Sequence, residues 1–532
     1  MNRAKLFLTL PVVILVLAAI GVRAQRRTTP RPQSPRPTPT ATASPKPTTP
    51  AAQPSPTQPG EIAPVTLAVV NDITITASDI QDQLNATILN DPDLYLRAFY
   101  QDREKAIKEA RQRAVEARIG SLLIATQAKK QGITAEELLD REINSKIVPP
   151  SDAEIRAAYN ANRDQIGGAD LESVRPQLIN YLRGQRSEEL YGALMNRLKM
   201  INTVMKHAEV NAPNLAPGTV LAAVNGQPIR IETINERMKS YVYKMEMRIY
   251  SVQKEILNRR INDLLIVAEA NKRKVGPEEI VRAEITDRIK PPSETEVSKF
   301  YEENKSRING ELATVRPNIV SYLEQQQQEK LETALAERLR VGAKVQLLLK
   351  EPEPPIQVIS DGNGPSRGDV NAPVKIVEFT DFQCSACGAM YPIIENTLKT
   401  YGNRVRFVVR NFPLTSVHAN AFRAAQAAAA ANVQGKFWEY IDYLFKNQNS
   451  LDVDSLKKYA TQAGLDRKRF DAEFESGKYD EQIRRDIEDG EMYGVESTPT
   501  IFINGVVLTD FSEEGLRAAI GRAFKKTSAP NP

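Results

Sequence analysis

The sequence predicts a multidomain chain in which duplicated, mostly α-helical modules precede an α/β domain with a helical insertion. Three observations predict this class. Short segments recur in the same order in two copies, and each copy carries apolar residues at helical spacing. The last third of the chain changes to a β-branched strand, a turn and a helix that opens at Cys384. With 532 residues, three or four domains are expected.

The first residues are interpreted as an export segment. Arg3 and Lys5 precede an apolar run, and Ala24 ends a small-residue site, so residues 1–24 are typical of a signal peptide. An uncleaved N-terminal anchor is the alternative. Residues 25–64 are rich in Pro, Thr and Ser and predict a disordered linker. The bulk of the chain is therefore expected in the periplasm or another extracytoplasmic space, where disulfide chemistry is common.

An internal repeat predicts two modules, at 65–210 and 216–350. The matching segments are LAVVNDITI at 67–75 with LAAVNGQPI at 221–229, PPS at 149–151 with 291–293, and VRP at 174–176 with 315–317. Because the order of the matches is kept, they indicate a duplication rather than chance. Each copy begins with a strand-like segment and a turn, and then continues into long helices.

Helix signals follow the paired prolines in both copies. Ser151 and Ser293 are each followed three residues later by a glutamate, Glu154 or Glu296, which predicts a capping box at the start of a helix. In the second copy, apolar residues at helical spacing continue through 279–289. These modules are therefore expected to be mostly helical, with amphipathic faces.

The repeated part resembles the N-terminal domain of SurA-type periplasmic chaperones, through its AVVNDITIT and AAVNGQPIR openings and its PPS helix starts. In that family a parvulin prolyl-isomerase domain usually lies between two of the helices. Only residues 165–170 and 308–312 stand at the corresponding places here. The resemblance implies two SurA-N-like modules that lack parvulin domains and bind unfolded clients. Modules that only space or dimerise the protein are the alternative.

A Cys-x-x-Cys pair follows the Pro-rich spacer at 351–355. The N–H groups at a helix N-terminus stabilise a thiolate at Cys384, and Cys387, one turn on, can close or resolve a disulfide. These are the only two cysteines in the chain, so they cannot form a structural disulfide framework. Half of a zinc site is the alternative, but His207 and His418 lack zinc-finger spacing. Neither a metal nor a bound cofactor is expected.

Residues 356–532 resemble the thioredoxin-fold family of DsbA-like thiol–disulfide oxidoreductases. Three separated features carry the resemblance: FTDFQCSAC at 379–387 with Pro392 in the same helix, VESTPTIFING at 495–505, and an alanine-rich block at 419–445. The resemblance implies a redox-active disulfide, with Cys384 as the exposed nucleophile and Cys387 as the buried resolving thiol. It also implies a cis-proline loop at Thr498 and Pro499 that binds extended substrates, and a helical insertion at the alanine-rich block.

Glu378 stands six residues before the first cysteine on an otherwise apolar strand. Thioredoxin-like proteins often hold a buried acid at this place, and a buried carboxyl has a raised pKa suited to proton transfer with Cys387. A solvent-facing acid is the alternative. His418 is interpreted as structural, and Trp438 as a core residue.

The predicted function is that of an exported thiol–disulfide oxidoreductase, which forms or exchanges disulfides in client proteins held by the helical modules. The expected partners are unfolded or cysteine-containing exported proteins and a membrane quinone-linked redox partner. A net charge of +5 gives no case for nucleic acid. A reductase or isomerase with the same site, and a chaperone whose redox domain is secondary, are the alternatives. The dipeptide Ser385-Ala386 leaves the direction of catalysis open.

Overall fold

The computed structural model describes residues 65–528, apart from 134, 164–169, 306–307, 309 and 416. The predicted export segment and linker, 1–64, lie outside the described residues, as does most of the connection at 165–170. The chain forms two compact units. One combines Asn90–Tyr250 with the residues from Glu351 onward, and the other combines the described residues up to Leu89 with Ser251–Lys350. The module boundaries drawn from the repeat stay a prediction.

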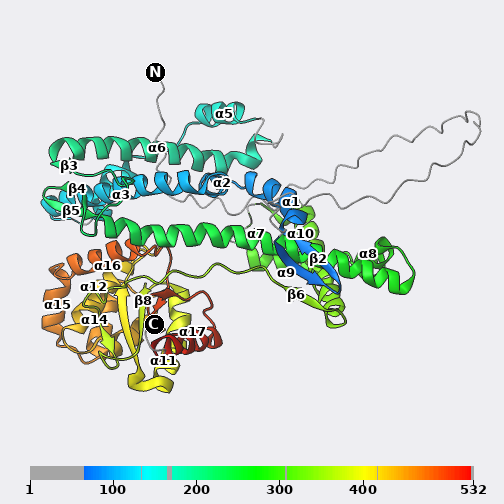
Figure 1. Cartoon of the computed structure of the whole chain (residues 1–532). Coiled ribbons are helices and arrows are strands. Elements are labelled where there is room, and N and C mark those ends of the chain that lie inside the picture. The colour runs from blue at the N-terminus through cyan, green and yellow to red at the C-terminus, as the bar shows by residue number, and fades with distance from the viewer. Residues whose placement is uncertain are drawn as a thin grey trace, which may run out of the picture. The chain divides into compact units, whose positions relative to one another are not determined.

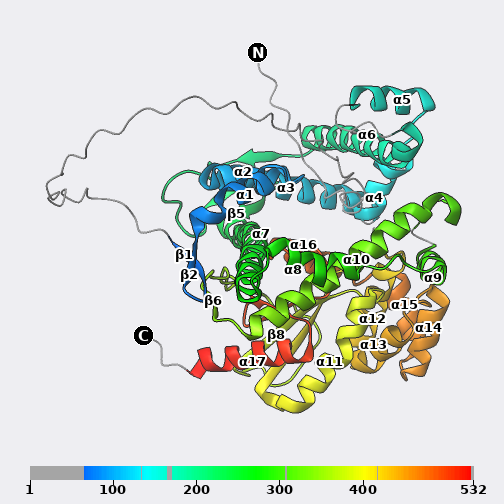
Figure 2. The ribbon, with the colours of Figure 1, turned by 90° about the vertical axis from the view of Figure 1, so that its right-hand side faces the viewer.

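The helical part of the first unit is organised around two long helices, α3 and α6, which lie side by side (Figures 1 and 2). Their apolar residues recur at helical spacing, so Ile119, Leu123 and Leu198 are fully buried in a shared core. The elements are α2 (Leu94–Gln101), α3 (Arg103–Gln131), α4 (Ala135–Glu142), η1 (Asn144–Lys146), α5 (Asp152–Ala161), α6 (Leu171–Ile201), β3 (Val204–Lys206), β4 (Val220–Val224), β5 (Gln227–Arg230) and the start of α7 (Ile231–Arg273).

The second unit repeats part of this arrangement. Its elements are β1 (Thr66–Val70), β2 (Ile73–Thr76), α1 (Ala77–Leu89), the rest of α7, α8 (Pro277–Glu284), η2 (Thr286–Arg288), α9 (Glu294–Asn304), α10 (Leu312–Val341) and β6 (Val345–Leu347). Val297, Tyr301 and Ile319 form a small core between α9 and α10. Ile155 and Leu178 form the matching core between α5 and α6 in the first unit. The two copies therefore fold alike at this helix pair.

The opening hairpin of each copy is completed by a strand from the end of the other copy. In the second unit, β1 pairs with β2 and with β6, so that Val70 lies opposite Val345. In the first unit, β4 pairs with β5 and with β3, so that Val224 lies opposite Val204. Each three-stranded sheet therefore combines segments from both copies of the repeat.

The predicted capping boxes are confirmed in both copies. The side chain of Ser151 accepts a hydrogen bond from the backbone N–H of Glu154, whose carboxylate accepts from the backbone N–H of Ser151, and the pair at residues 293 and 296 does the same. The helical spacing expected through 279–289 is interrupted. Lys274, with a φ of 57°, follows the end of α7, and α8 ends at Glu284 before a short 3-10 turn.

The C-terminal domain contains a five-stranded sheet with the strand order β11-β10-β8-β9-β7. Its strands are β7 (Ser366–Arg367), β8 (Val374–Thr380), β9 (Val405–Asn411), β10 (Thr500–Ile503) and β11 (Val506–Val507), and its helices outside the insertion are α11 (Ser385–Tyr401), η3 (Gly402–Arg404) and α17 (Glu513–Ser528). β8 runs parallel to β9 and antiparallel to β10. The central strand β8 therefore ends beside the N-terminus of α11.

Successive side chains of β8 point to opposite faces of the sheet. Val374 and Ile376 belong to the core that includes residues of α11 and α17. Val377 and Phe379 belong to a separate core on the other face, with Tyr493. Because side chains of a strand alternate, residue 378 shares the face of α11 and α17.

A helical insertion separates β9 from β10, and its helices lie together beside the sheet (Figure 1). It contains α12 (Ala421–Asn432), α13 (Phe437–Lys446), α14 (Val453–Gln462), α15 (Arg467–Glu475) and α16 (Asp480–Met492). The alanine-rich block predicted at 419–445 covers the first helix and nearly all of the second, and three more helices follow. The alanines of α12 are buried, because small side chains let neighbouring helices approach closely. The predicted fold class, a helical part followed by an α/β domain with a helical insertion, is confirmed.

A buried ion pair joins this insertion to the sheet. Nε of Arg410 in β9 donates to Oδ1 of Asp486 in α16 at 2.6 Å, and both side chains are almost fully inaccessible. Asn411 donates to the same carboxylate from its backbone and from its side chain. Nη2 of Arg410 also donates to Asp489 at 2.7 Å, so the arginine has two counter-ions, whereas removal of Arg410 would leave the buried Asp486 without its counter-ion.

Within the part of the chain that the structure describes, no helix has the length and apolar character needed to cross a membrane.

Candidate active site

The first cysteine stands at the junction between β8 and α11. Cys384 is the N-cap residue of α11, with extended backbone angles, and its N–H donates to the carbonyl of Asp381 at 3.1 Å. Its own carbonyl accepts from the N–H of Gly388, the first hydrogen bond of the helix, also at 3.1 Å. The unpaired N–H groups of a helix N-terminus favour a negative charge at this position. The predicted kinking proline, Pro392, lies within the same helix.

The two cysteines differ in accessibility less than the sequence predicts. Cys387 is fully buried, but Cys384 is also only 8% exposed. The prediction of an exposed nucleophile is therefore wrong. The reason is that the loop before β10 covers the sulfur, whose thiol donates a hydrogen bond to the carbonyl of Thr498 at 3.3 Å. Cys384 remains the more accessible of the two, and neither cysteine is in a disulfide here.

The surroundings separate the acidities of the two thiols. A hydrogen bond from the Cys387 thiol lowers the pKa of Cys384 to about 5, aided by the Thr498 hydroxyl and by the N–H groups of residues 386 and 387, against the opposing effect of burial. Burial raises the pKa of Cys387 well above the ordinary value, and its hydrogen bond to Cys384 and the charge of Glu378 act in the same direction. At neutral pH the pair therefore holds one thiolate, at Cys384, and one protonated thiol, at Cys387.

The loop before β10 has the geometry that the sequence predicts. The peptide bond between Thr498 and Pro499 is cis, and β10 follows directly, with Thr500 opposite Phe379 of β8. Asn504 and Gly505, both with positive φ, form the two-residue turn between β10 and β11. The structure therefore brings Thr498 and Cys384 together, although 114 positions separate them in the sequence.

Replacing Thr498 with valine is expected to raise the pKa of Cys384 by about one. The buried Thr498 hydroxyl has no hydrogen-bond partner among the described residues, so it can turn to donate to the thiolate, and a hydrogen bond to a charged group contributes about 1.5 kcal/mol. The measurement is the pH dependence of the ultraviolet absorbance of the thiolate in the reduced chain. Thr500→Val is the matched control, since that hydroxyl donates to the carbonyl of Ser497 instead. A Thr498→Val variant that titrates like the wild type would show that the hydroxyl has no effect on the sulfur.

Glu378 occupies the middle of the sheet. It lies on β8 between Val409 of β9 and Ile501 of β10, and only 3% of it is exposed. Burial raises its pKa to about 8, with a further increase from the charge of Cys384 and an opposing hydrogen bond from Thr380. The carboxyl is therefore protonated at neutral pH and lies on the face of the sheet that carries α11.

Asp381 and His418 form a contact that the sequence did not indicate. Oδ2 of Asp381 accepts from the backbone N–H of Leu414 at 2.8 Å and lies 2.8 Å from Nδ1 of His418, while Oδ1 accepts from the N–H of Gln383. The carboxylate itself is fully buried. His418 therefore ties the loop after β9 to the turn before the cysteine, in agreement with a structural role. An aspartate three residues before a cysteine gives no signal for such a partner.

Other residues singled out in the sequence take structural places. The ring of Trp438 packs against the main core of the domain, with the guanidinium of Arg367 over it at 3.8 Å. Among the described residues no group of three or more His, Cys, Asp or Glu side chains is arranged to hold a metal ion.

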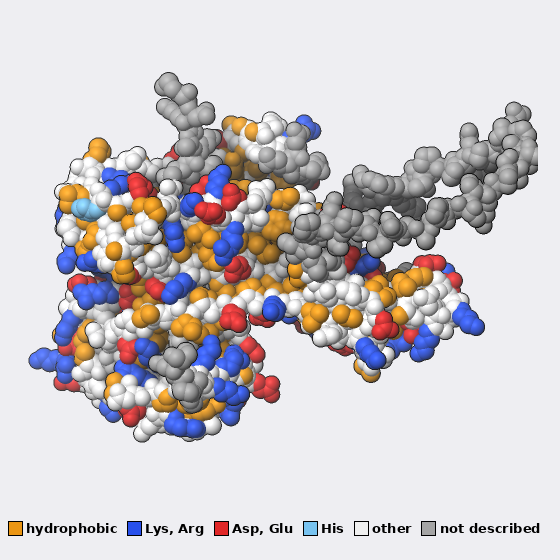
Figure 3. Space-filling view, in the orientation of Figure 1, with side chains coloured by type: hydrophobic (Ala, Val, Ile, Leu, Met, Phe, Trp, Pro, Cys, Tyr) orange, Lys and Arg blue, Asp and Glu red, His pale blue; other side chains and the backbone are white. Residues whose placement is uncertain are grey.

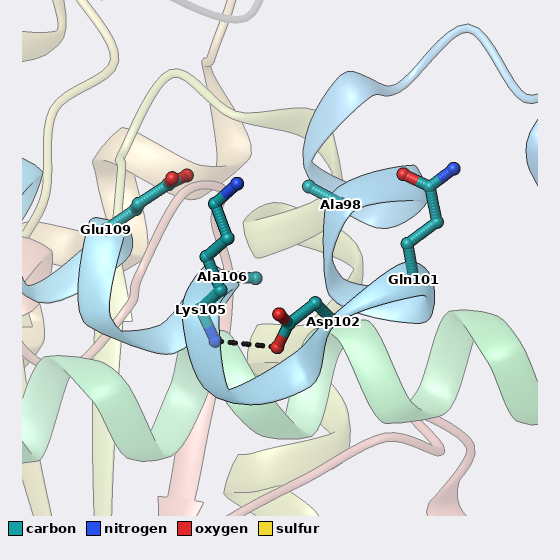
Figure 4. Close-up of a pocket in the computed structure, with 6 residues that line it drawn as sticks. All are labelled: Ala98, Gln101, Asp102, Lys105, Ala106 and Glu109. Atoms are coloured by element: carbon teal, nitrogen blue, oxygen red, sulfur yellow. Dashed lines mark hydrogen bonds between the residues drawn. The ribbon is translucent and has the colours of Figure 1, made fainter.

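A small pocket of about 120 Å³ lies at the junction of α2 and α3 (Figure 4). Its lining includes Asp102, which caps α3 by accepting a hydrogen bond from the backbone N–H of Lys105 at 3.0 Å. The remaining lining residues are Ala98, Gln101, Lys105, Ala106 and Glu109. The carboxylate is already used as a cap, and no cysteine or histidine lines the pocket, so this hollow offers no redox chemistry.

Comparison with known proteins identifies the C-terminal domain. A family model described as thioredoxin matches residues 360–522, so this domain is thioredoxin-like. Among curated proteins, the Na(+)/H(+) antiporter NhaA 1 of Mycolicibacterium vanbaalenii is 38% identical over 142 residues, which are 26% of this chain and 23% of the antiporter. The Na(+)/H(+) antiporter NhaA 3 of Salinispora tropica is 39% identical over 159 residues, 30% of this chain and 24% of that protein. The chain thus spans about a quarter of the length of the curated relatives it matches.

Several solved structures are similar to about a third of the chain. Oxidised BdbD from Bacillus subtilis is 20% identical and covers 33% of this chain and 100% of its own, with a TM-score of 0.31. A thioredoxin-like oxidoreductase from Silicibacter pomeroyi is 24% identical and covers 31% of this chain and 93% of its own, with a TM-score of 0.29. A periplasmic thioredoxin-like protein from Salmonella enterica serovar Typhimurium is 20% identical and covers 31% and 92%, with a TM-score of 0.26.

Proposed function

We propose that the chain is an exported protein thiol–disulfide oxidoreductase of the DsbA-like type, which forms disulfides in client proteins through Cys384 and Cys387. One observation carries the proposal: the first cysteine of a Cys-x-x-Cys pair opens the helix after the central strand, with its sulfur 3.3 Å from the carbonyl of Thr498 in the cis-proline loop. The pKa shifts of the two thiols agree with it, because they differ in direction, downward at Cys384 and upward at Cys387. Such a difference is what a nucleophile and a resolving thiol need. The thioredoxin-like fold and the cis-proline loop beside the sulfur support the same proposal.

In the oxidising direction, a client thiolate attacks Sγ of Cys384 in the enzyme disulfide. The bond between the two enzyme sulfurs breaks, and Cys387 leaves and takes a proton from the carboxyl of Glu378. A second client thiol gives its proton to the carboxylate of Glu378, which restores the carboxyl, and attacks the client sulfur of the mixed disulfide. Cys384 then leaves as the thiolate. Two electrons pass from the client to the enzyme, and the loop at Thr498 and Pro499 binds the extended client backbone.

The acidity of Cys384 supports the oxidising direction. A stabilised thiolate favours the reduced enzyme, so the enzyme disulfide is a stronger oxidant. A pKa of about 5 lies between the values of about 7 for thioredoxin and about 3.5 for DsbA. The reductase alternative requires the dithiol to give its two electrons to a client disulfide, which a stabilised thiolate does less readily. Re-oxidation of the dithiol requires an electron acceptor, for which the family resemblance suggests a membrane quinone-linked partner.

The reduction potential of the full chain tests this direction. After equilibration with glutathione, we expect a potential between that of thioredoxin, about −270 mV, and that of DsbA, about −120 mV. The fraction of oxidised pair is measured by alkylation of the remaining thiols, with Cys384→Ser as the blank. A potential at or below that of thioredoxin would overturn the oxidising direction. A pair that does not exchange with glutathione at all would overturn the proposed function.

We further propose that the helical modules hold unfolded clients near the redox site. Large apolar side chains are exposed on α6 and the strand that follows it: Tyr181, Met200, Ile201 and Met205. Figure 3 shows hydrophobic side chains interspersed with charged ones across the helical part. Apolar side chains of this kind suit weak binding to unfolded polypeptide. A bound client has its cysteines at a raised effective concentration near the pair. The predicted export segment supports an extracytoplasmic location for this activity.

A further inference from the structure

The side-chain amide of Gln448 binds backbone carbonyl groups on both sides of Gln383, the residue before the nucleophile Cys384. Gln448 lies in the helical insertion, in the loop after α13. Its Nε2 donates to the carbonyl of Phe382 at 3.1 Å and to the carbonyl of Cys384 at 2.7 Å. A side-chain amide has two N–H donors, so both are used here. The glutamine therefore contacts the peptide group of the nucleophile itself from 64 positions away in the sequence.

The peptide group that Gln448 binds is the one that opens α11. The carbonyl of Cys384 also accepts the first hydrogen bond of the helix, from Gly388. The next two N–H groups along the chain, those of Ala386 and Cys387, stabilise the Cys384 thiolate. A change in the ψ angle of Cys384 would rotate this first peptide and move the following N–H groups relative to the sulfur. A donor on the Cys384 carbonyl resists that rotation.

Gly388 leaves the space that Gln448 occupies. A Cβ at position 388 would lie 2.4 Å from Oε1 of Gln448 and 2.9 Å from its Cδ, a distance at which one group must move. Glycine within a helix is destabilising relative to alanine. The backbone of Gly388 is helical and has no positive φ, so the glycine is not required by its own conformation. The amide of Gln448 is the group that requires it.

We propose that Gln448 is a positioning residue that holds the Cys384 peptide in the orientation at which the first N–H groups of α11 face the sulfur. This inference rests on the proposed function, since it concerns the same redox pair. It assigns to the helical insertion a part in the chemistry, because the insertion supplies the residue that fixes the nucleophile. Gln448 does not itself contact the client or the reacting sulfur.

Three variants of the full chain test the proposal: Gln448→Ala, Gly388→Ala and the double variant. The readout is the titration of the Cys384 thiolate, by ultraviolet absorbance and by the pH dependence of alkylation. Near pH 5 we expect Gln448→Ala to lower the thiolate fraction about threefold. Gly388→Ala should do nearly the same, because its methyl group displaces the amide. The double variant should show no further loss, since the two changes act through one contact.

Melting temperatures separate positioning from simple destabilisation. In the Gln448→Ala background the clash is gone, so Gly388→Ala should raise the melting temperature through better helix propensity. Gln434→Ala is the matched control. Its side chain also bridges a backbone, accepting from the N–H of Asp466 and donating to its carbonyl, but it does not touch the cysteine turn. This control should lower stability and leave the thiolate titration unchanged.

Additive effects of Gln448→Ala and Gly388→Ala, or folded variants that titrate like the wild type, would overturn the proposal. The titration requires no client protein. If the wild type failed to exchange disulfides while the variants shifted the titration as expected, the positioning would stand and the proposed function would fall. If the wild type exchanged disulfides and the variants titrated normally, the reverse would hold.

Discussion

Disulfide exchange with a reduced client falls to the uncatalysed rate when Cys384 is replaced with serine, according to the proposed mechanism. The reason is chemical, because a hydroxyl cannot form the mixed disulfide through which every step passes. Cys387→Ser keeps the nucleophile and loses the resolving thiol, so its Cys384 thiolate should attack the disulfide of an oxidised client, release one client thiolate and accumulate as a stable mixed disulfide. The measurement is the rate of disulfide formation in a reduced model protein, with non-reducing electrophoresis to detect the adduct.

The Cys384→Ser variant also separates the redox activity from client binding. The two sulfur atoms lie in the C-terminal domain, whereas the exposed apolar residues of α6 lie in the helical part. Suppression of client aggregation should therefore survive Cys384→Ser with an unchanged dose dependence. Residual catalysed exchange in Cys384→Ser would contradict the assignment of the nucleophile. Loss of both activities in a folded variant would contradict the division of work between the two parts.

Replacing Glu378 with glutamine is expected to stabilise the C-terminal domain at neutral pH. In the wild type the carboxyl ionises at about pH 8 when folded, compared with the ordinary 4.5. Below pH 4.5 both states are protonated and the two proteins are equally stable. As the pH rises, the unfolded state loses its proton first, so the free energy of unfolding of the wild type falls, by about 3 kcal/mol at pH 7. Glutamine does not ionise and avoids this loss.

The single tryptophan makes this measurement specific. Trp438 lies in the C-terminal domain, so its fluorescence in urea reports on the unfolding of that domain alone. The lowered pKa of Cys384 has the opposite sign, stabilising the folded state as the pH rises through about 5, but both proteins share it. The difference between them should be near zero at pH 4 and grow up to about pH 8. A difference that does not change with pH would show that the carboxyl is not buried in its neutral form.

The same substitution should slow catalysis while it raises stability. Glu378 is the proposed proton donor to Cys387, and loss of general acid–base catalysis costs at least about tenfold in rate. We therefore expect slower turnover of the mixed disulfide in Glu378→Gln. A more stable and equally fast variant would remove Glu378 from the mechanism and leave the roles of the two cysteines intact.

Local signals made part of this structure predictable. The two capping boxes and the strand that leads into the cysteine turn each depend on residues close together in the sequence, whereas the cis bond before Pro499 was expected from the family resemblance. The burial of Glu378 was also predictable, because apolar residues surround it on the strand. Apart from the cis bond, the relevant contacts are encoded by a few neighbouring positions or by spacing along one strand.

Long-range contacts were not predictable from one sequence. Gln448 and His418 reach the cysteine turn only after the helical insertion has folded back on the sheet. The low exposure of Cys384 has the same origin, because the residue that covers it, Thr498, comes from another strand. The pairing of strands between the two repeats could not be predicted for a different reason. Both copies open with the same motif, so pairing within a copy and pairing between copies fit the sequence equally well.

That exchange has a consequence for the order in which the protein is made. Synthesis proceeds from the N-terminus, so β1 and β2 emerge long before their neighbour β6. Until Val345 follows, one edge of this hairpin carries backbone groups without the partner strand. The edge of β1 that pairs with β6 therefore stays unpaired until the end of the second copy has been synthesised. A nascent or truncated chain exposes this edge, which can pair with a strand of another chain. The thioredoxin-like domain comes after the closing strand in the sequence, so the redox site is synthesised only after the strand that covers that edge.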